Sequence, residues 1–324
     1  MNIKIIISFL TCMMMLFSCQ KDVDVFTPNG SPIGVDTNWV ASISSTSPII
    51  DLKTALNKAV QFDSLDCTLG GSVTTQEGLT IAIAPNSLLL SNGTPVIGKV
   101  YSESLLIRQK GDMIRTDRPT TSNGRLLISG GEIFLRFRKD LEELHLAPGK
   151  RVYVKYADPS PITFMRLFLG DESNPLQFNW LPYPDSSNFG FGTPNAPSYE
   201  FSSPNLRWLN CDHFADSTGS RVNIVASLPI DYTNANTAVY LVFHDIRSMM
   251  SMYGDPATKK FSSAKVPTGK QVTVVSITKK GNNSYYLGHN STVTNLTGTV
   301  AVQVVPLSPQ PTSLTDIRAY LSTL

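Results

Sequence analysis

The feature that most constrains the fold is an alternation of large apolar residues with small or polar ones, broken at short intervals by turn residues. Leu79, Ile81 and Ile83 alternate with threonine and alanine, which places three apolar side chains on one face of a strand. Comparable segments lie at 96–107, 126–137, 150–156, 163–169, 222–226, 238–244, 271–277 and 300–305. Short strands without long helices between them are typical of sandwiches and open barrels. We predict an all-β fold with two β-sandwich or partly open barrel domains.

Helical spacing is confined to short segments of the chain. Residues 51–60 carry apolar side chains four positions apart, and residues 311–324 have an apolar face that Thr312 or Ser313 can cap. The methionine cluster at 249–252 predicts a short helix packed on the core, with a recognition surface as the alternative. A short C-terminal helix therefore completes the predicted all-β fold.

Composition excludes two classes of function. The formal net charge is +2 and the charged fraction is 16%, below the ~25% of an average soluble domain. A disordered polyelectrolyte is excluded, and so is a nucleic-acid-binding protein that depends on a strong basic field. Four His and four Cys leave little material for a multi-ligand metal site or a disulfide-rich scaffold. We expect no cofactor and no metal.

The N-terminus has the pattern of an export signal. Lys4 precedes an uncharged run from Ile5 to Phe17. A run of this length is short of the ~20 apolar residues that span a bilayer, and it matches the apolar stretch of about 7 to 15 residues in a signal peptide. We predict that residues 1–18 are a signal peptide that is removed on export.

The residues that end this signal, Leu16-Phe17-Ser18-Cys19, resemble the lipobox of bacterial lipoproteins. The resemblance implies that the Cys19 thiol receives a diacylglycerol and its amino group a fatty acyl chain such as palmitate, which together anchor more firmly than one chain. No Asp follows Cys19 directly, and the acidic stretch at 22–24 resembles the tether that directs lipoproteins of Bacteroidota-type bacteria to the cell surface. We expect an outer-membrane lipoprotein facing the cell surface or the periplasm; the alternative is an ordinary secretory signal.

Composition also suggests how the rest of the chain is divided. The predicted parts are a tether and lead-in (19–60), a first β domain (61–170), a connector (171–207), a second β domain (208–310) and the C-terminal helix (311–324). The connector is rich in Pro, Ser and Asn but also contains aromatic residues. Because a solvated linker would not keep aromatic side chains exposed, we expect the connector to pack across a domain surface.

The order of turn motifs between Gly70 and Gly170 resembles the ZU5-like β module of envelope lipoproteins in Bacteroidota. The matching segments lie at 78–81, 84–87, 92–93, 98–100, 112–113, 119–124, 129–132 and 148–150, and Asn92-Gly93 predicts a type I′ hairpin. The resemblance implies a module for binding or scaffolding. Some relatives cleave themselves at His-Phe-Ser, but residues 213–215 read His-Phe-Ala. Without the nucleophilic hydroxyl, self-cleavage is not expected.

Cys211 and His213 are the strongest candidates for catalysis, because a thiolate beside an imidazole is an activated nucleophile. Residues two apart on a strand are ~6.5 to 7 Å apart, beyond hydrogen-bonding distance. We therefore expect no enzymatic activity. Cys67 could form a disulfide with Cys211, but the two fall in different predicted domains, which favours free buried thiols.

Polar residues concentrate between positions 108 and 123. This segment either binds a polar partner or is a solvated connection that hydrogen-bonds to its own backbone. The candidate interaction residues are Arg108, Asp112, Arg115, Asp117, Thr120 and Asn123. The candidate structural residues are Cys67, Glu132, Trp208, Cys211 and Asp212, with Glu132 expected to be a buried acid near one of these arginines.

Two serines resemble a glycosylation acceptor. Ser64 and Ser217 each follow Asp and precede Leu or Thr, as in the O-glycosylation acceptor of exported Bacteroidota proteins. The sequence as a whole predicts a non-catalytic, lipid-anchored module that binds a protein or a glycan and no nucleic acid. The alternatives are a periplasm-facing structural lipoprotein and a cryptic hydrolase of glycans or peptides.

Overall fold

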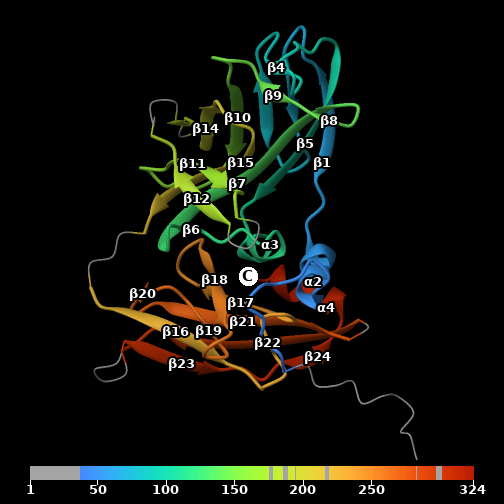
Figure 1. The fold of residues 1–324 in the computed structure, drawn as a ribbon. Helices are drawn as coiled ribbons and strands as arrows, with labels where there is room; N and C mark the ends of the chain where they lie inside the picture. The colour runs from blue at the N-terminus through green and yellow to red at the C-terminus, as the bar shows by residue number, and fades with distance from the viewer. Residues whose placement is uncertain are drawn as a thin grey trace, which may run out of the picture. The chain divides into compact units, whose positions relative to one another are not determined.

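The protein is mostly antiparallel β-sheet, as Figure 1 shows. The computed structural model describes residues 37–324 except 175–177, 185–188, 194, 216–218, 282 and 297–300. Thr37–Leu324 form one compact unit. The signal peptide, Cys19 and Ser217 lie outside the described residues. The predicted all-β fold is confirmed.

The first part of the unit is a β-sandwich. Its eight-stranded sheet runs in the order β1 (Gln61–Asp66), β5 (Lys99–Ile107), β7 (Arg125–Lys139), β15 (Arg207–Phe214), β11 (Arg166–Asp171) and β12 (Asn179–Pro182), with β6 (Thr121–Ser122) and β8 (Glu142–Glu143) on β7. Its five-stranded sheet runs β13 (Phe189–Phe191), β14 (Ser198–Ser203), β10 (Val152–Ala157), β3 (Thr80–Ile83) and β2 (Gly71–Thr74). Leu79 and Ile81, singled out by their spacing, are fully buried in the core between the two sheets.

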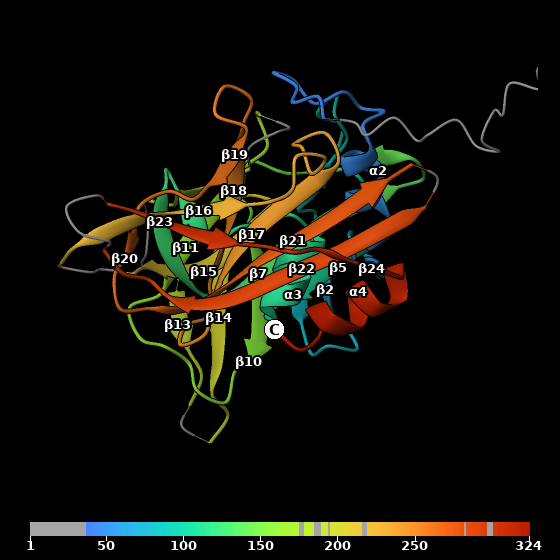
Figure 2. The same ribbon diagram turned by 90° about the horizontal axis from the view of Figure 1, so that it is seen from below.

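The second part is a nine-stranded sheet, seen from below in Figure 2. Its order is β20 (Val266–Pro267), β16 (Arg221–Ser227), β19 (Lys260–Ser262), β18 (Met249–Asp255), β17 (Thr237–Phe243), β21 (Gln271–Lys280), β22 (Ser284–Val293) and β24 (Gln310–Thr312), with β23 (Val302–Pro306) parallel to β16. Leu241, Phe243 and Val272 belong to its own core. The nine-stranded sheet thus has a hydrophobic core of its own.

A third core joins the eight-stranded sheet to the nine-stranded one through α2 (Pro48–Leu56), α3 (Lys110–Arg115) and α4 (Leu314–Leu321). Trp180 of the first sheet and Val275 of the nine-stranded sheet both belong to it and are fully buried. Ser313 caps α4, because its hydroxyl accepts a hydrogen bond from the Asp316 N–H at 3.0 Å. The short helices therefore fill the space between the two sheets.

The lead-in before α2 is fixed to the nine-stranded sheet. The Asn234 side chain donates to the Val40 carbonyl at 2.7 Å and accepts from the Val40 N–H at 3.0 Å. The Trp39 ring lies 4.9 Å from the Phe261 ring, measured between centroids. The chain that would follow a lipid anchor thus enters the compact unit at this sheet.

The structure differs from the sequence expectations around Trp208. The segment assigned to the start of the second β domain is β15, which pairs with β7 and β11 inside the first sheet. Residues expected to form a connector instead supply strands to both sheets of the sandwich, and Tyr199 and Phe201 lie in its core. The reason is that these strands pair with partners distant in sequence, which local composition does not reveal.

Two local expectations are wrong. The methionine cluster forms strand β18, with Met249, Met250 and Met252 all buried, because the run is too short for its periodicity to separate helix from strand. Asn92-Gly93 does turn the chain, but only Gly93 has a positive φ, of 83°. A type I′ turn needs positive φ at both residues, so the hairpin is of another type. Its arms are joined by the bridge from Leu89 to Pro95 and by the Leu90 N–H, which donates to the Thr94 carbonyl at 2.9 Å.

Candidate functional site

Two buried carboxyl groups lie side by side where β7 meets β15. Glu132 is paired with Asn210 and Asp212 with Ser129, and the register shifts between Cys211 and Asp212 at a β-bulge. Cross-strand partners lie on the same face of a sheet, so all four side chains share one face. Glu132 and Asp212 are both 0% exposed. The bulge thus brings together two acids that are distant in the sequence.

The hydrogen bonds of this buried pair are incomplete. One oxygen of Asp212 accepts from the Asn210 amide at 2.7 Å, while its other oxygen and both oxygens of Glu132 have no hydrogen-bond partner among the residues that the structure describes. The Arg118 guanidinium stacks on the rings of Phe178 and Trp208, at 4.2 and 4.4 Å from their centroids. Unpaired buried polar atoms are costly, so this cluster lowers the stability of the fold.

Burial changes the acidity of both groups. Desolvation raises the pKa of Glu132 well above its usual range, Asp212 raises that pKa further, and Arg118 opposes both effects. Desolvation likewise raises the pKa of Asp212, and the interactions with Ser129 and Asn210 oppose this rise. The groups therefore hold their protons at pH values where exposed acids are ionised. Because no solvent reaches them, they can act on the fold but not directly on a substrate.

The hairpin between β17 and β18 is attached to the sandwich at this bulge. The Arg247 carbonyl accepts from the Ser129 N–H at 3.0 Å, and the Arg247 guanidinium donates to the Gly130 carbonyl at 3.0 Å and to buried Asp158 at 3.1 Å. Arg247 is also one of the groups that oppose the rise in the pKa of Asp212. The acid pair therefore lies next to a contact between the eight-stranded sheet and the nine-stranded sheet.

Thr120 strengthens the same connection. It is fully buried, its hydroxyl lies 2.7 Å from that of Ser248, and its backbone N–H donates to the Met249 carbonyl at 3.0 Å. The Met249 N–H in turn donates to the Thr120 hydroxyl at 2.8 Å. This candidate interaction residue is thus part of an internal contact.

The other candidate interaction residues also have internal partners. Arg108 donates to the Ala157 carbonyl at 2.8 Å, Asp117 pairs with Lys53 at 2.7 Å, and the side chains of Asn123 and Asn179 are 2.9 Å apart. Asp112 pairs with Lys58 at 3.0 Å and with Arg115 at 2.9 Å. These contacts favour the reading of the 108–123 segment as a connection bonded within the protein, and residues 110–115 of it form helix α3.

The cysteines lie in one core and not in two domains. Cys67 and Cys211 are both fully buried members of the sandwich core, and both are free thiols. Burial raises the pKa of Cys211 well above its usual range, which keeps it a thiol and removes the thiolate that a nucleophile needs. His213 uses Nδ1 in a 2.9 Å contact with the Phe214 carbonyl. The pair therefore lacks the features of an activated cysteine.

A ladder of ion pairs, not among the predicted features, lies on the outer face of the sandwich. Glu103 pairs with Arg136 and with Arg138, and Arg207 pairs with Glu143 at 2.9 Å and Glu172 at 2.6 Å. Arg136 also approaches Glu143, at 3.7 Å. The spacing of two between Arg136 and Arg138 on one strand is the signal that could have placed both on the same face. Positive and negative side chains alternate along the ladder, so it carries no net charge.

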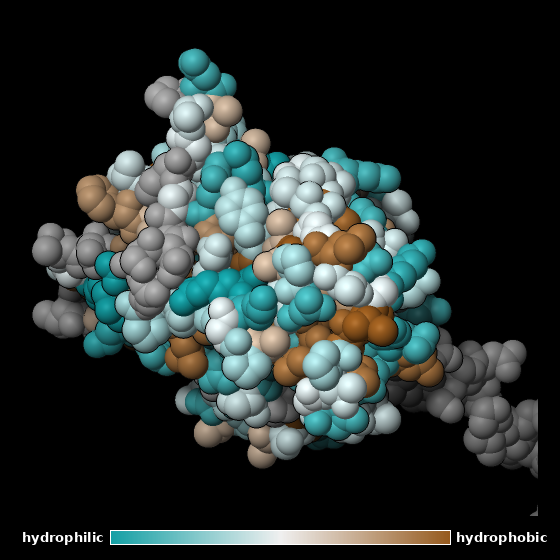
Figure 3. All heavy atoms as spheres, turned by 90° about the horizontal axis from the view of Figure 1, so that it is seen from above, coloured by the Kyte–Doolittle hydropathy of each residue, from teal (hydrophilic) through white to brown (hydrophobic). Residues whose placement is uncertain are grey.

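Three large apolar side chains are exposed at one end of the eight-stranded sheet. Leu69, Ile97 and Leu141 are 74%, 65% and 91% exposed and follow β1, precede β5 and follow β7. We call these three residues the apolar tip. Antiparallel pairing puts these turns at the same end. Figure 3 looks onto this end, where apolar patches are separated by polar residues.

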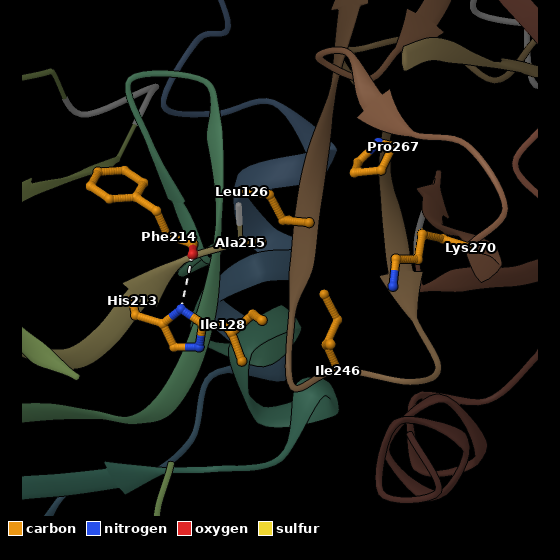
Figure 4. A pocket seen from close by; sticks show the side chains of 8 residues that line it. All are labelled: Leu126, Ile128, His213, Phe214, Ala215, Ile246, Pro267 and Lys270. Atoms are coloured by element: carbon orange, nitrogen blue, oxygen red, sulfur yellow. Dashed lines mark hydrogen bonds between the residues drawn. The ribbon is translucent and has the colours of Figure 1, made fainter. Parts of the chain in front are cut away.

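A small, partly open pocket lies where the sandwich meets the nine-stranded sheet (Figure 4). It encloses about 230 Å³ and is lined by Leu126, Ile128, His213, Phe214, Ala215, Ile246, Pro267 and Lys270. Ile246 and Lys270 face His213 and Leu126 across the gap. The pocket is therefore apolar, with two polar side chains among its lining residues.

Metal sites, membrane-spanning helices and the predicted glycosylation at Ser64 can be examined only in the described part of the chain. No group of three or more His, Cys, Asp or Glu side chains in this part could hold a metal ion. No helix in it has the length and apolarity to cross a membrane. Ser64 lies on β1, opposite Tyr101 of β5. Its modification stays a prediction.

Comparison with models of known protein families, with curated proteins and with solved structures finds no match. The resemblances to lipoproteins and to ZU5-like modules therefore stay predictions from the motifs.

Proposed function

We propose that the chain is a lipoprotein anchored in the outer membrane through Cys19, and that its two β units form a non-catalytic module that binds a protein or glycan partner at the cell envelope or surface. The anchor is inferred from the Leu16-Phe17-Ser18-Cys19 motif after the apolar signal. The proposal takes a ZU5-like role for the sandwich, which implies binding rather than a reaction.

The apolar tip is the observation that carries the binding role. Exposed large apolar side chains grouped on a soluble surface mark contact sites more often than isolated ones do. Along the same two strands, Phe62 and Tyr101 add two exposed aromatic rings on the outer face of β1 and β5. The candidate nucleophile Cys211 is fully buried and held as a thiol, which favours binding over catalysis.

A photo-crosslinking amino acid at position 141 tests the binding role in intact cells. We expect a discrete protein adduct at Leu141, because this side chain is the most exposed of the apolar tip. The matched control carries the same amino acid at Ile230, which is 69% exposed and lies between strands β16 and β17 of the nine-stranded sheet. If the partner is a glycan, dextran, laminarin or arabinoxylan should instead raise the melting temperature, by mass action.

Equal labelling at positions 141 and 230, together with no polysaccharide effect on melting, contradicts a binding role for the apolar tip. A polysaccharide response that persists in the double variant Ile97→Asp, Leu141→Asp would contradict it as well. Both side chains are exposed, so these substitutions should leave the fold intact.

A further inference from the structure

We propose that the pocket between the sandwich and the nine-stranded sheet binds the end of an acylated apolar amino acid, with one large apolar side chain, a free α-carboxylate and an adjacent amide N–H. This inference goes beyond the proposed function, because it adds a second binding site to the module. The pocket lies away from the apolar tip and uses none of the residues assigned to the 108–123 segment.

The volume of the pocket limits the occupant to one apolar group. A cavity of ~150 Å³ binds benzene, whereas sites for drug-sized ligands enclose about 300 to 1,000 Å³. At about 230 Å³ the pocket is large enough for a substituted ring or a branched aliphatic side chain. It is too small for an oligosaccharide, so the polysaccharide partner considered for the apolar tip does not fit here.

The walls favour the same kind of group. Six of the lining residues are apolar, and they come from both units: Leu126, Ile128, Phe214 and Ala215 from the sandwich, and Ile246 and Pro267 from the nine-stranded sheet. An apolar side chain held between them would remove apolar surface of both units from water. Binding should therefore strengthen the contact between the units as well as hold the ligand.

Lys270 supplies the charge that selects a carboxylate. Its ammonium group pairs with Asp245 at 2.7 Å, and both side chains are partly exposed. Exposed pairs of this kind contribute little stability, and an ammonium group has three N–H donors. A ligand carboxylate can therefore share Lys270 with Asp245 or replace it.

His213 supplies an acceptor for the amide N–H. Its Nδ1 lies 2.9 Å from the Phe214 carbonyl, and a carbonyl can only accept, so Nδ1 carries the proton. In the neutral ring Nε2 is then an acceptor, and Figure 4 shows this nitrogen on the side of the ring away from the Phe214 carbonyl. An apolar wall, a cation and an acceptor together match a side chain, a carboxylate and an N–H of one terminal residue.

N-acetyl-L-phenylalanine is the direct probe, and its carboxamide is the matched control without charge. We expect saturable binding of the acid by the full soluble chain, measured by calorimetry and by a rise in melting temperature. The carboxamide and the Lys270→Met variant should each bind about tenfold more weakly, because both remove a charge-assisted hydrogen bond. Lys260→Met, which changes an exposed lysine outside the pocket, should bind as the unmodified protein does.

The same chemistry occurs at the C-terminus of a peptide and in a free acylated amino acid, and a peptide probe separates the two sources. Tighter binding of Gly-Gly-Gly-Phe than of N-acetyl-L-phenylalanine assigns the pocket to peptide ends, and equal binding assigns it to the small molecule. An Ile246→Trp variant that folds but fills the pocket should bind neither.

Three outcomes overturn the proposal: no saturation at millimolar acid, equal affinity for the acid and the carboxamide, or full binding by Lys270→Met. None of these outcomes bears on the lipid anchor or on the apolar tip, which are tested separately at Cys19 and Leu141. Hydrolysis of the probe would instead contradict the non-catalytic function itself.

Discussion

Replacement of Gly111 by alanine is expected to displace the C-terminal helix. A Cβ at position 111 would lie 1.8 Å from the Leu321 carbonyl oxygen and 2.5 Å from its carbon, so α3 and α4 could not keep their contact. Release of α4 exposes Ile317 and Leu321, which are both fully buried. At ~1.5 to 3 kcal/mol for each large apolar side chain, the loss of stability should be about 3 to 6 kcal/mol.

Hydrogen exchange of the backbone amides in residues 314–324 measures this effect directly. The Gly111→Ala variant should lose protection in this segment and melt at a lower temperature. Gly190→Ala is the matched control, because a Cβ there would meet only the Glu200 carbonyl, at 3.8 Å. Unchanged protection of α4 in Gly111→Ala would show that the packing of α3 on α4 is not as close as described.

Replacement of Glu132 by glutamine is expected to stabilise the protein as the pH rises. Burial raises the pKa of Glu132 in the folded state, so the folded state keeps a proton that the unfolded state releases. The contribution of Glu132 to the free energy of unfolding is therefore complete below the usual pKa of ~4.3. It is lost as the pH rises towards the raised pKa of the folded state. In that window one such group costs about 1.4 kcal/mol per pH unit, and glutamine removes the ionisation.

Denaturant unfolding from pH 4 to pH 9 tests this prediction. The curves of the unmodified protein and of Glu132→Gln should meet near pH 4 and separate above it, with the variant more stable. Adding Asp212→Asn should flatten the pH dependence further, since the pKa of Asp212 is raised for the same reason. Asp140→Asn, at an exposed aspartate just after β7, is the control. A variant that is less stable at every pH would mean that the Glu132 carboxylate has a partner that stabilises it.

Local patterns in the sequence predicted much of the fold. Apolar residues at every second position identify most of the long strands, because alternating burial is a local property of a strand with one face in a core. Ser313 and the apolar spacing of residues 314–321 likewise predicted helix α4. Local patterns fail where strands pair with partners distant in sequence. They assign Trp208 to the second β domain, whereas its strand pairs with β7 in the sandwich. They also assign Cys67 and Cys211 to different domains, whereas both lie in one core.

The candidate site was predictable only in part. Glu132 was expected to be a buried acid near an arginine, and Arg118 does act on its pKa. Its neighbour Asp212 could not be inferred, because their contact depends on the β7–β15 register and on a bulge. The pocket depends on how the sandwich meets the nine-stranded sheet, and no local pattern in the sequence encodes that contact.

In the proposed function, Cys19 anchors two folded β units at the envelope. The most direct measurement is membrane fractionation and protease treatment of intact cells, for the unmodified protein and for Cys19→Ala. We expect the unmodified protein to sediment with outer membranes and Cys19→Ala to be soluble with an unchanged melting temperature. Degradation without lysis would place the β units outside the cell, and protection until lysis would place them in the periplasm. A Cys19→Ala protein that stayed in the membrane fraction would contradict anchoring through Cys19.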